Sequence, residues 1–242
     1  MEKIRPMLFT TLKKYSGAQL MSDVVAGIIV AIIALPLSIA LALASGVGPE
    51  QGIYTAIAAG FVISFLGGSQ VQIAGPTAAF ATIVAGIVAR SGVEGLAVAT
   101  IMAGIILVIM GFCQLGSLIK FIPFTITTGF TSGIAVTIVI GQLKDFFGVT
   151  CPAGMETIET MQKLKAFAAG FGTMNVHALI VGLVCLAILI VMPKITEKIP
   201  GSLVAFLVGI VMVKFLPLQV NTIGNLYSVS NALPAFHMPA FS

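Results

Sequence analysis

The residues best suited to binding an anion lie between Gly67 and Phe80. In this segment Gln70 and Gln72 alternate with apolar residues, and Gly75-Pro76-Thr77 then begins a run of small and apolar residues. Proline is favoured in the first turn of a helix, because the N–H group that it lacks would have no partner there. The free N–H groups and the positive dipole end of such a helix form an anion site. The alternative is an ordinary loop before a short core helix, and the pattern alone leaves both open.

The helix that follows this segment is short. The run from Thr77 to Arg90 cannot cross a bilayer, which requires about 20 residues, so it indicates a half-helix that begins near the midplane. Ser69 to Ala74 alternate as in a strand and predict an extended backbone. We expect protein to shield this backbone, because lipid cannot satisfy its polar groups.

A second candidate lies in the first long apolar run, around Pro36 and Ser38. A proline inside a helix frees a backbone carbonyl and bends the helix, which membrane proteins tolerate where the break lines a cavity. Ser38 is the only hydroxyl near this proline. Such a hydroxyl packs helices together more often than it binds a ligand, and both roles stay open.

Other site chemistries have little support in the sequence. There are three Cys and two His, without metal-ligand spacing, at positions 113, 151 and 185 and at 177 and 237. No ionisable residue lies securely inside an apolar run, and no carboxylate pair or activated nucleophile is evident. We therefore expect no enzyme activity, no cofactor and no metal site.

The composition predicts an integral membrane protein. The chain has 242 residues, of which 58% are hydrophobic and 8% charged, and its mean hydropathy is +1.14. A soluble domain carries roughly 25% charged residues, so the solvent of this chain must be the lipid bilayer. A net charge of +4 is too small for a nucleic-acid surface, and we expect no nucleic-acid partner.

Seven apolar runs predict an all-α membrane protein of seven transmembrane segments, with a short extended stretch before a half-helix third span. The runs cover about 24–45, 52–67, 76–90, 95–115, 122–142, 177–193 and 200–216. Residues 1–21 are basic at Lys3, Arg5, Lys13 and Lys14, and predict a cytoplasmic amphipathic segment on the membrane surface. An odd number of spans fits one inverted repeat of a transporter. Residues 217–242 would then be a loop leading to a second repeat, and the alternative is a complete seven-span protein.

Several short motifs follow one another between Asp23 and about Gly148. They are Asp23-Val24-Val25-Ala26-Gly27, Leu35-Pro36 with 38–42, Gly52-Ile53-Tyr54, Gly75-Pro76-Thr77, Phe121-Ile122-Pro123, Gly129-Phe130-Thr131-Ser132-Gly133 and Gln142-Leu143-Lys144. In this order and spacing they resemble the sulfate permease (SulP) family of anion transporters, which includes prestin. The resemblance implies two inverted seven-span repeats, with a core domain (spans 1–4, residues 22–120), a gate domain (spans 5–7, residues 121–216) and usually a cytoplasmic STAS domain.

The resemblance also implies which residues line the anion site. The start of the third span matches at Pro76, Thr77, Ala78 and Ala79, and the lining face of the first span at Leu37, Ser38 and Leu41. Several relatives have glutamine in place of Leu37, and an aromatic residue in place of Leu41 or Thr77. Thr77 resembles members that move bicarbonate, but one hydroxyl cannot choose among bicarbonate, sulfate and dicarboxylates.

The resulting hypothesis is a secondary active transporter of inorganic anions, sulfate first and bicarbonate next. It would work in the plasma membrane, as a multi-pass protein of the bacterial inner membrane, by elevator-like alternating access. Symport or exchange with a coupling cation, Na+ or H+, and a homodimer of the full-length protein are expected. The alternatives are a nucleobase permease of the same fold, and an anion channel or structural membrane protein.

Overall fold

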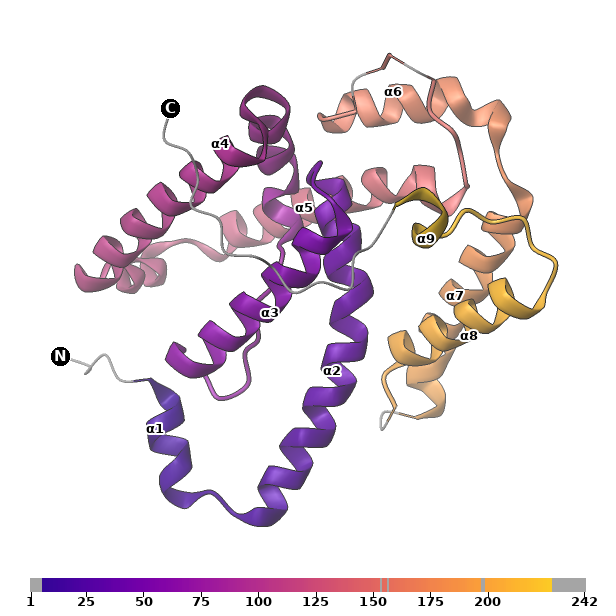
Figure 1. Ribbon diagram of the computed structural model, residues 1–242. Helices are drawn as coiled ribbons and strands as arrows, with labels where there is room; N and C mark the ends of the chain where they lie inside the picture. Colours follow the sequence, from indigo (N-terminus) through magenta and orange to yellow (C-terminus); the bar gives the residue numbers. More distant parts are fainter. Residues whose placement is uncertain (1–5, 153, 156, 197–198, 228–242) are drawn as a thin grey trace. The chain divides into compact units, whose positions relative to one another are not determined.

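The computed structural model describes residues 6–152, 154–155, 157–196 and 199–227, and its regular structure there is entirely helical (Figure 1). The elements in chain order are α1 (Met7–Thr11), η1 (Leu12–Lys14), α2 (Gly17–Ala44), α3 (Pro49–Leu66), α4 (Ala78–Phe112), η2 (Leu115–Phe121), α5 (Phe124–Phe146), α6 (Thr160–Gly170), η3 (Phe171–Thr173), α7 (Val176–Ile195), α8 (Gly201–Phe215) and α9 (Ile223–Leu226). The prediction of an all-α protein is confirmed for the described residues.

Among the described helices, α2, α4, α5 and α7 are long and apolar enough to cross a membrane. The apolar helix α8 is shorter, and α3 has a polar first turn. Each of these six helices overlaps a predicted apolar run, because a long apolar run carries a strong sequence signal. The seven-span count remains a prediction, since four helices meet the length and composition of a span.

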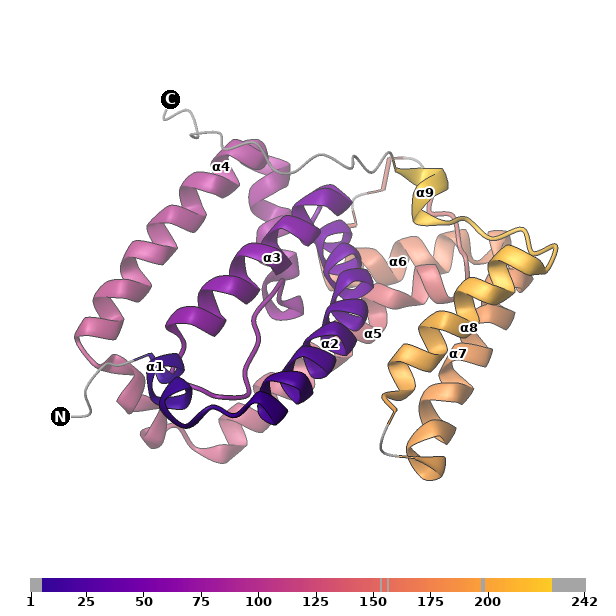
Figure 2. The same ribbon diagram turned by 60° about the horizontal axis from the view of Figure 1, so that its bottom comes forward.

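The long helix α4 is interrupted at Gly92, whose φ of 67° and ψ of −172° are not helical. Only glycine adopts this conformation readily. The two limbs, 78–91 and 93–112, meet at an angle in Figures 1 and 2. At 1.5 Å per residue the first limb is about 21 Å long, which is shorter than the roughly 30 Å hydrocarbon core. It therefore has the length of the predicted half-helix.

Two compact units make up the described chain. The first contains α1–α3, residues 67–77 and α7–α9, and the second contains residues 44–47, α4, α5 and α6. This division is based on contacts between residues of this chain, and it does not test the predicted domains. The predicted core and gate domains, 22–120 and 121–216, remain a prediction.

In the first unit, α2 and α3 are in close contact at Gly52. A Cβ atom built on Gly52 would lie 2.3 Å from the backbone oxygen of Ser38 and 2.8 Å from Cβ of Ala42. Ser38, Ala42 and Gly52 are buried. Small residues allow membrane helices to approach in this way, so the absence of a side chain at Gly52 fixes the spacing of the two helices.

The helices α7 and α8 lie side by side as an antiparallel pair (Figures 1 and 2). The Cys185 thiol donates a hydrogen bond to the Ala205 carbonyl at 3.4 Å. Asn175 caps α7, because its Oδ1 accepts from the His177 backbone N–H at 2.9 Å. Its Nδ2 donates to the Gln219 carbonyl at 2.7 Å, which joins the start of α7 to the chain beyond α8.

In the second unit, the chain between α5 and α7 folds back on itself outside the candidate spans. Gly170 packs against the turn after α5, where a Cβ atom on Gly170 would lie 2.6 Å from the Thr150 carbonyl oxygen. The Thr173 hydroxyl accepts from the Thr150 N–H at 2.9 Å and donates to the Gly170 carbonyl at 2.7 Å. The rings of Phe147, Phe167 and Phe171 contact one another beside this turn in tilted and edge-to-face arrangements. The polar stretch 144–170 is therefore partly a folded helix, α6, which the sequence did not predict.

The structure shifts two boundaries at the ends of the chain. Helix α2 begins at Gly17, so the last residues of the predicted surface segment 1–21 already belong to the first membrane helix. At the other end, the predicted loop 217–242 includes the single turn of α9. Residues 228–242 of that loop lie outside the described residues.

Candidate functional site

The segment before α4 has the predicted break in helical structure. Residues 67–77 are neither helix nor strand, and α4 begins at Ala78. Pro76 and Thr77 stand immediately before the helix, and the Thr77 hydroxyl is 3.5 Å from the Gly75 carbonyl oxygen, to which it donates. The prediction that no continuous helix runs through residues 70–80 is confirmed.

The start of α4 offers backbone donors rather than charged side chains. The first N–H groups of a helix have no acceptor within it, and in α4 they begin at Ala78 and Ala79, which are half-buried. Together with the positive end of the helix dipole, they suit a small anion. The small side chains leave these groups accessible, and the hydroxyl of Thr77 is exposed beside them.

Most side chains of the segment before α4 are exposed in the described part of the chain. Val71 is 94% exposed and Ile73 is 59% exposed, and Gln70 and Gln72 are exposed as well. In this stretch the Val71 N–H donates to the Ser69 hydroxyl at 3.4 Å. Within the first unit the stretch meets α3 at Ala74, whose carbonyl oxygen would lie 3.8 Å from a Cβ atom on Gly60. Shielding of the remaining residues by protein stays a prediction.

In α2, the proline does not interrupt the helix. The helix runs from Gly17 to Ala44 with Pro36 inside it, although proline removes the donor that the carbonyl of Ile32 would have used. Ser38 is 4% exposed and its backbone contacts Gly52 of α3, whereas Leu37 is 57% exposed. Ser38 thus takes part in helix packing, and a further contact of Ser38 with an anion remains a prediction.

The predicted site residues belong to both units. Leu37, Ser38, Leu41, Pro76 and Thr77 lie in the first unit. Ala78 and Ala79 lie in the second unit. That the two sets face each other across one site remains a prediction. Within the described residues, no group of three or more His, Cys, Asp or Glu side chains is arranged to hold a metal ion.

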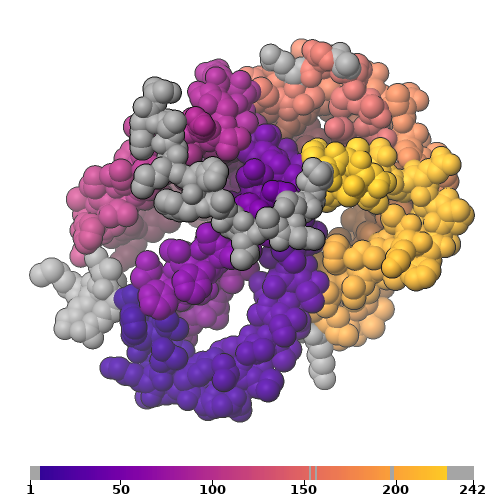
Figure 3. Space-filling view, in the orientation of Figure 1, coloured from indigo at the N-terminus to yellow at the C-terminus, as the bar shows by residue number. Residues whose placement is uncertain are grey.

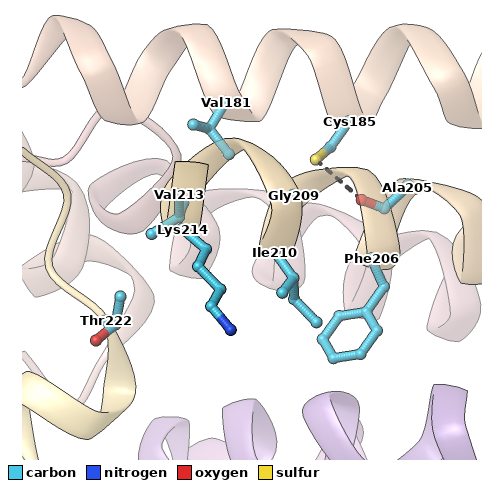
Figure 4. A pocket seen from close by; sticks show the side chains of 9 residues that line it. All are labelled: Val181, Cys185, Ala205, Phe206, Gly209, Ile210, Val213, Lys214 and Thr222. Atoms are coloured by element: carbon cyan, nitrogen blue, oxygen red, sulfur yellow. Dashed lines mark hydrogen bonds between the residues drawn. The ribbon is translucent and has the colours of Figure 1, made fainter. Parts of the chain in front are cut away.

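A groove between α7 and α8 was not anticipated from the sequence. It has a volume of about 530 Å³ and is lined by Val181, Cys185, Ala205, Phe206, Gly209, Ile210, Val213, Lys214 and Thr222 (Figure 4). Its lining is apolar except for Lys214 and Thr222. An inorganic anion would lose its hydration there and find few donors in return, so this groove does not fit an anion site. The small residues Ala205 and Gly209 in α8 are the sequence feature from which this groove could have been predicted.

The sequence model described as the sulfate permease family matches residues 20–242. The chain belongs to the sulfate permease family. The resemblance found in the short motifs is thereby confirmed, and the protein is a multi-pass membrane protein.

The matches cover nearly all of this chain and less than half of its curated relatives. It is 41% identical over 229 residues to the putative sulfate transporter YvdB of Bacillus subtilis, covering 94% of this chain and 43% of that protein. It is 33% identical over 231 residues to the bicarbonate transporter BicA of Picosynechococcus, covering 91% of this chain and 40% of that protein. The chain thus spans about two fifths of their length.

Two solved structures share the fold. The transmembrane domain of a cyanobacterial BicA matches with a TM-score of 0.73 and 29% identity, over 92% of this chain and 57% of that one. The structure of SLC26A9 matches with a TM-score of 0.67 and 21% identity, over 88% of this chain and 37% of that one, and supports the fold alone. Both curated relatives are named as transporters.

Proposed function

We propose that this chain forms the amino-terminal half of a secondary active transporter of inorganic anions in the plasma membrane. The observation that carries the proposal is the helix start at Ala78, preceded by the non-helical residues 67–77, which include Pro76. A half-helix of this kind presents free N–H groups and a positive dipole end, as in transporters built from broken helices. The names of the relatives, transporters of sulfate and bicarbonate, support anions as the substrate class.

The proposed site needs more than this chain supplies. One helix terminus contributes about 0.3–2 kcal/mol to holding an anion. A dissociation constant of 1 mM corresponds to about 4.1 kcal/mol, so one terminus binds far more weakly than millimolar. The remaining part of a longer protein would add an opposing terminus or a countercharge. We therefore expect residues 1–242 alone to show no measurable anion binding or saturable uptake after reconstitution, and saturable uptake by them would contradict this argument.

Sulfate is the first candidate substrate and bicarbonate the second. Symport or exchange with Na+ or H+, a homodimer, and sliding of residues 22–120 against 121–216 belong to the same proposal. A nucleobase permease of the same fold is the alternative function, and it would require an acidic residue to pair with the base. Flux that saturates with substrate and depends on a second ion separates a transporter from a channel.

Thr77 offers the most direct test of the site. In the full-length protein that carries this chain, Thr77→Phe should fill the space before α4 and abolish uptake of radiolabelled sulfate into proteoliposomes, with folding intact. Thr77→Ser keeps the hydroxyl and should retain uptake. Thr100→Phe is the matched control, because Thr100 is exposed on the second limb of α4, where its hydroxyl bonds only the Leu96 carbonyl at 2.8 Å.

The outcomes of this test separate the alternatives. Unchanged affinity and rate in Thr77→Phe would remove Thr77 from the site. Uptake of a nucleobase, with no uptake of sulfate or bicarbonate, would replace the proposed function with its alternative. Flux that rises linearly with anion concentration would indicate a channel.

A further inference from the structure

The amino-terminal segment, residues 7–15, packs against the end of α3. The Met7 N–H donates to the Gly67 carbonyl at 2.9 Å, and the Phe9 ring meets the Phe65 ring edge to face, with centroids 6.1 Å apart. The Phe65 ring stacks in turn on Phe61, at 6.2 Å. Figures 1 and 2 show α1 beside this end of α3. Gly67 is the last contact before the extended residues that lead to Pro76.

The other end of this segment is attached to α2. The Tyr15 hydroxyl donates to the Asp23 carboxylate, and the Ser16 hydroxyl accepts from the Gln19 N–H at 3.2 Å at the start of the helix. The hydrogen bond to Asp23, with some desolvation and the negative charge of Asp23, raises the pKa of the Tyr15 phenol. Residues 7–15, which we call the amino-terminal clamp, are therefore held at both ends by neighbouring membrane helices.

The outer face of the clamp combines apolar and basic side chains. Phe9 and Leu12 are each 54% exposed, and Lys13 and Lys14 are exposed beside them at the end of η1. Figure 3 shows this indigo surface of α1, η1 and the start of α2. Exposed apolar side chains next to basic ones are typical of segments that lie in the interface of a membrane. The clamp directly precedes α2, so it lies where a membrane surface would be.

We propose that the amino-terminal clamp binds the headgroups of anionic phospholipids through Lys13 and Lys14, with Phe9 and Leu12 entering the interface, and thereby fixes residues 67–77. Charge complementarity selects anionic over zwitterionic lipid, since each lysine near an anionic surface increases binding about fivefold. The hydrogen bond from Met7 to Gly67 transmits this restraint to the extended segment. Lipid binding is independent of the proposed function, whereas any effect on uptake rests on it.

Hydrogen exchange measured by mass spectrometry tests this proposal on the full-length protein in nanodiscs. One lipid composition is phosphatidylcholine alone, and the other contains phosphatidylglycerol in addition. We expect phosphatidylglycerol to slow exchange in peptides covering 7–15 and 67–77. The effect of two lysines amounts to roughly thirtyfold at most, and 1 M salt should remove most of it because the Debye length falls to about 3 Å.

Charge variants identify the residues responsible. Lys13→Gln with Lys14→Gln should abolish the dependence on phosphatidylglycerol. Lys144→Gln with Lys165→Gln removes the same charge at two exposed positions and should leave the dependence intact. Lys163 is unsuitable as a control, because partial burial lowers the pKa of its amine. Equal exchange in both lipid compositions, or equal loss in both double variants, would overturn the proposal.

The coupling between the clamp and residues 67–77 is tested separately. Phe65→Ala removes the ring contact with Phe9 and leaves the lipid-binding residues of the clamp unchanged. It should therefore reduce the lipid response of residues 67–77 more than that of residues 7–15. A response confined to residues 7–15 in the unmodified protein would overturn the coupling. Lipid-dependent exchange in a protein that transports no anion would support the clamp and count against the proposed function.

Discussion

Replacement of Gly52 by alanine tests the packing that positions the first membrane helix. Helices α2 and α3 touch at this glycine, and a methyl group there would lie 2.3 Å from the Ser38 carbonyl oxygen and 2.8 Å from Cβ of Ala42. Neither neighbour is the end of a flexible side chain, so the methyl group can be accommodated only if the two helices move apart. That movement would displace Ser38, a predicted site residue.

The magnitude follows from two opposing effects. Overpacking of this kind costs about 1–3 kcal/mol. Alanine in place of glycine inside a helix gains about 1 kcal/mol, which offsets part of that cost. Gly60→Ala, in the same helix, isolates the second effect, because its methyl group would meet only the Ala74 carbonyl oxygen at 3.8 Å, an ordinary contact. The two variants should therefore differ in free energy of unfolding by about 1–3 kcal/mol, with Gly52→Ala the less stable.

Reversible unfolding in mixed detergent micelles, followed by circular dichroism, measures this difference. The same two variants, in the full-length protein, should also differ in anion uptake, since only Gly52→Ala moves Ser38. Equal stability of the two variants would refute the close α2–α3 contact. Equal uptake with unequal stability would show that the contact supports folding without shaping the site.

Three further predictions concern the second unit, the α7 cap and the topology. Gly170→Ala should destabilise the protein by about 1–3 kcal/mol, while Gly172→Ala, with no atom within 4 Å of its added methyl group, should not, as thermal unfolding would show. Asn175→Ala should cost about 1 kcal/mol for the lost cap and about 1 more for the lost hydrogen bond to Gln219, and Asn175→Asp should recover the first part in chemical unfolding. A cysteine at Asn221, in a cysteine-free background, should react with an impermeant reagent added outside, and labelling only from the cytoplasmic side would mean that a span is miscounted.

The positions of the helices could be predicted because apolar runs are long and their ends are polar or rich in glycine. The run predicted at 122–142 corresponds to α5, Phe124–Phe146, and the run at 177–193 to α7, Val176–Ile195. The boundary predicted between the third and fourth runs falls at Gly92, the non-helical residue inside α4. Helix ends and the break at Gly92 depend on the residues close to them in the sequence, so they can be predicted from short segments.

The contacts between helices could not be predicted in the same way. A helix that is apolar on every side gives no moment that marks its buried face, so the sequence could not show that Ser38 lies against Gly52. A proline in an apolar run does not by itself show whether the helix is interrupted there. Helix α2 continues through Pro36. The exposure of Val71 depends on which elements cover residues 67–77, and no local pattern contains that information.

The small size of the buried residues suits the proposed anion site, which has no charged side chains. The buried apolar residues in the described part of the chain are five alanines and one valine: Ala42, Ala81, Ala85, Ala166, Ala205 and Val149. Contacts between such residues bring backbones together and set their spacing, while large apolar side chains stay on the outside. At the start of α4 the side chains are also small, so backbone N–H groups are the available donors. Substrate choice should therefore depend on backbone spacing and on the size of the side chain at Thr77, which is why substitutions that change volume at Gly52 and Thr77 are more informative than substitutions that change charge.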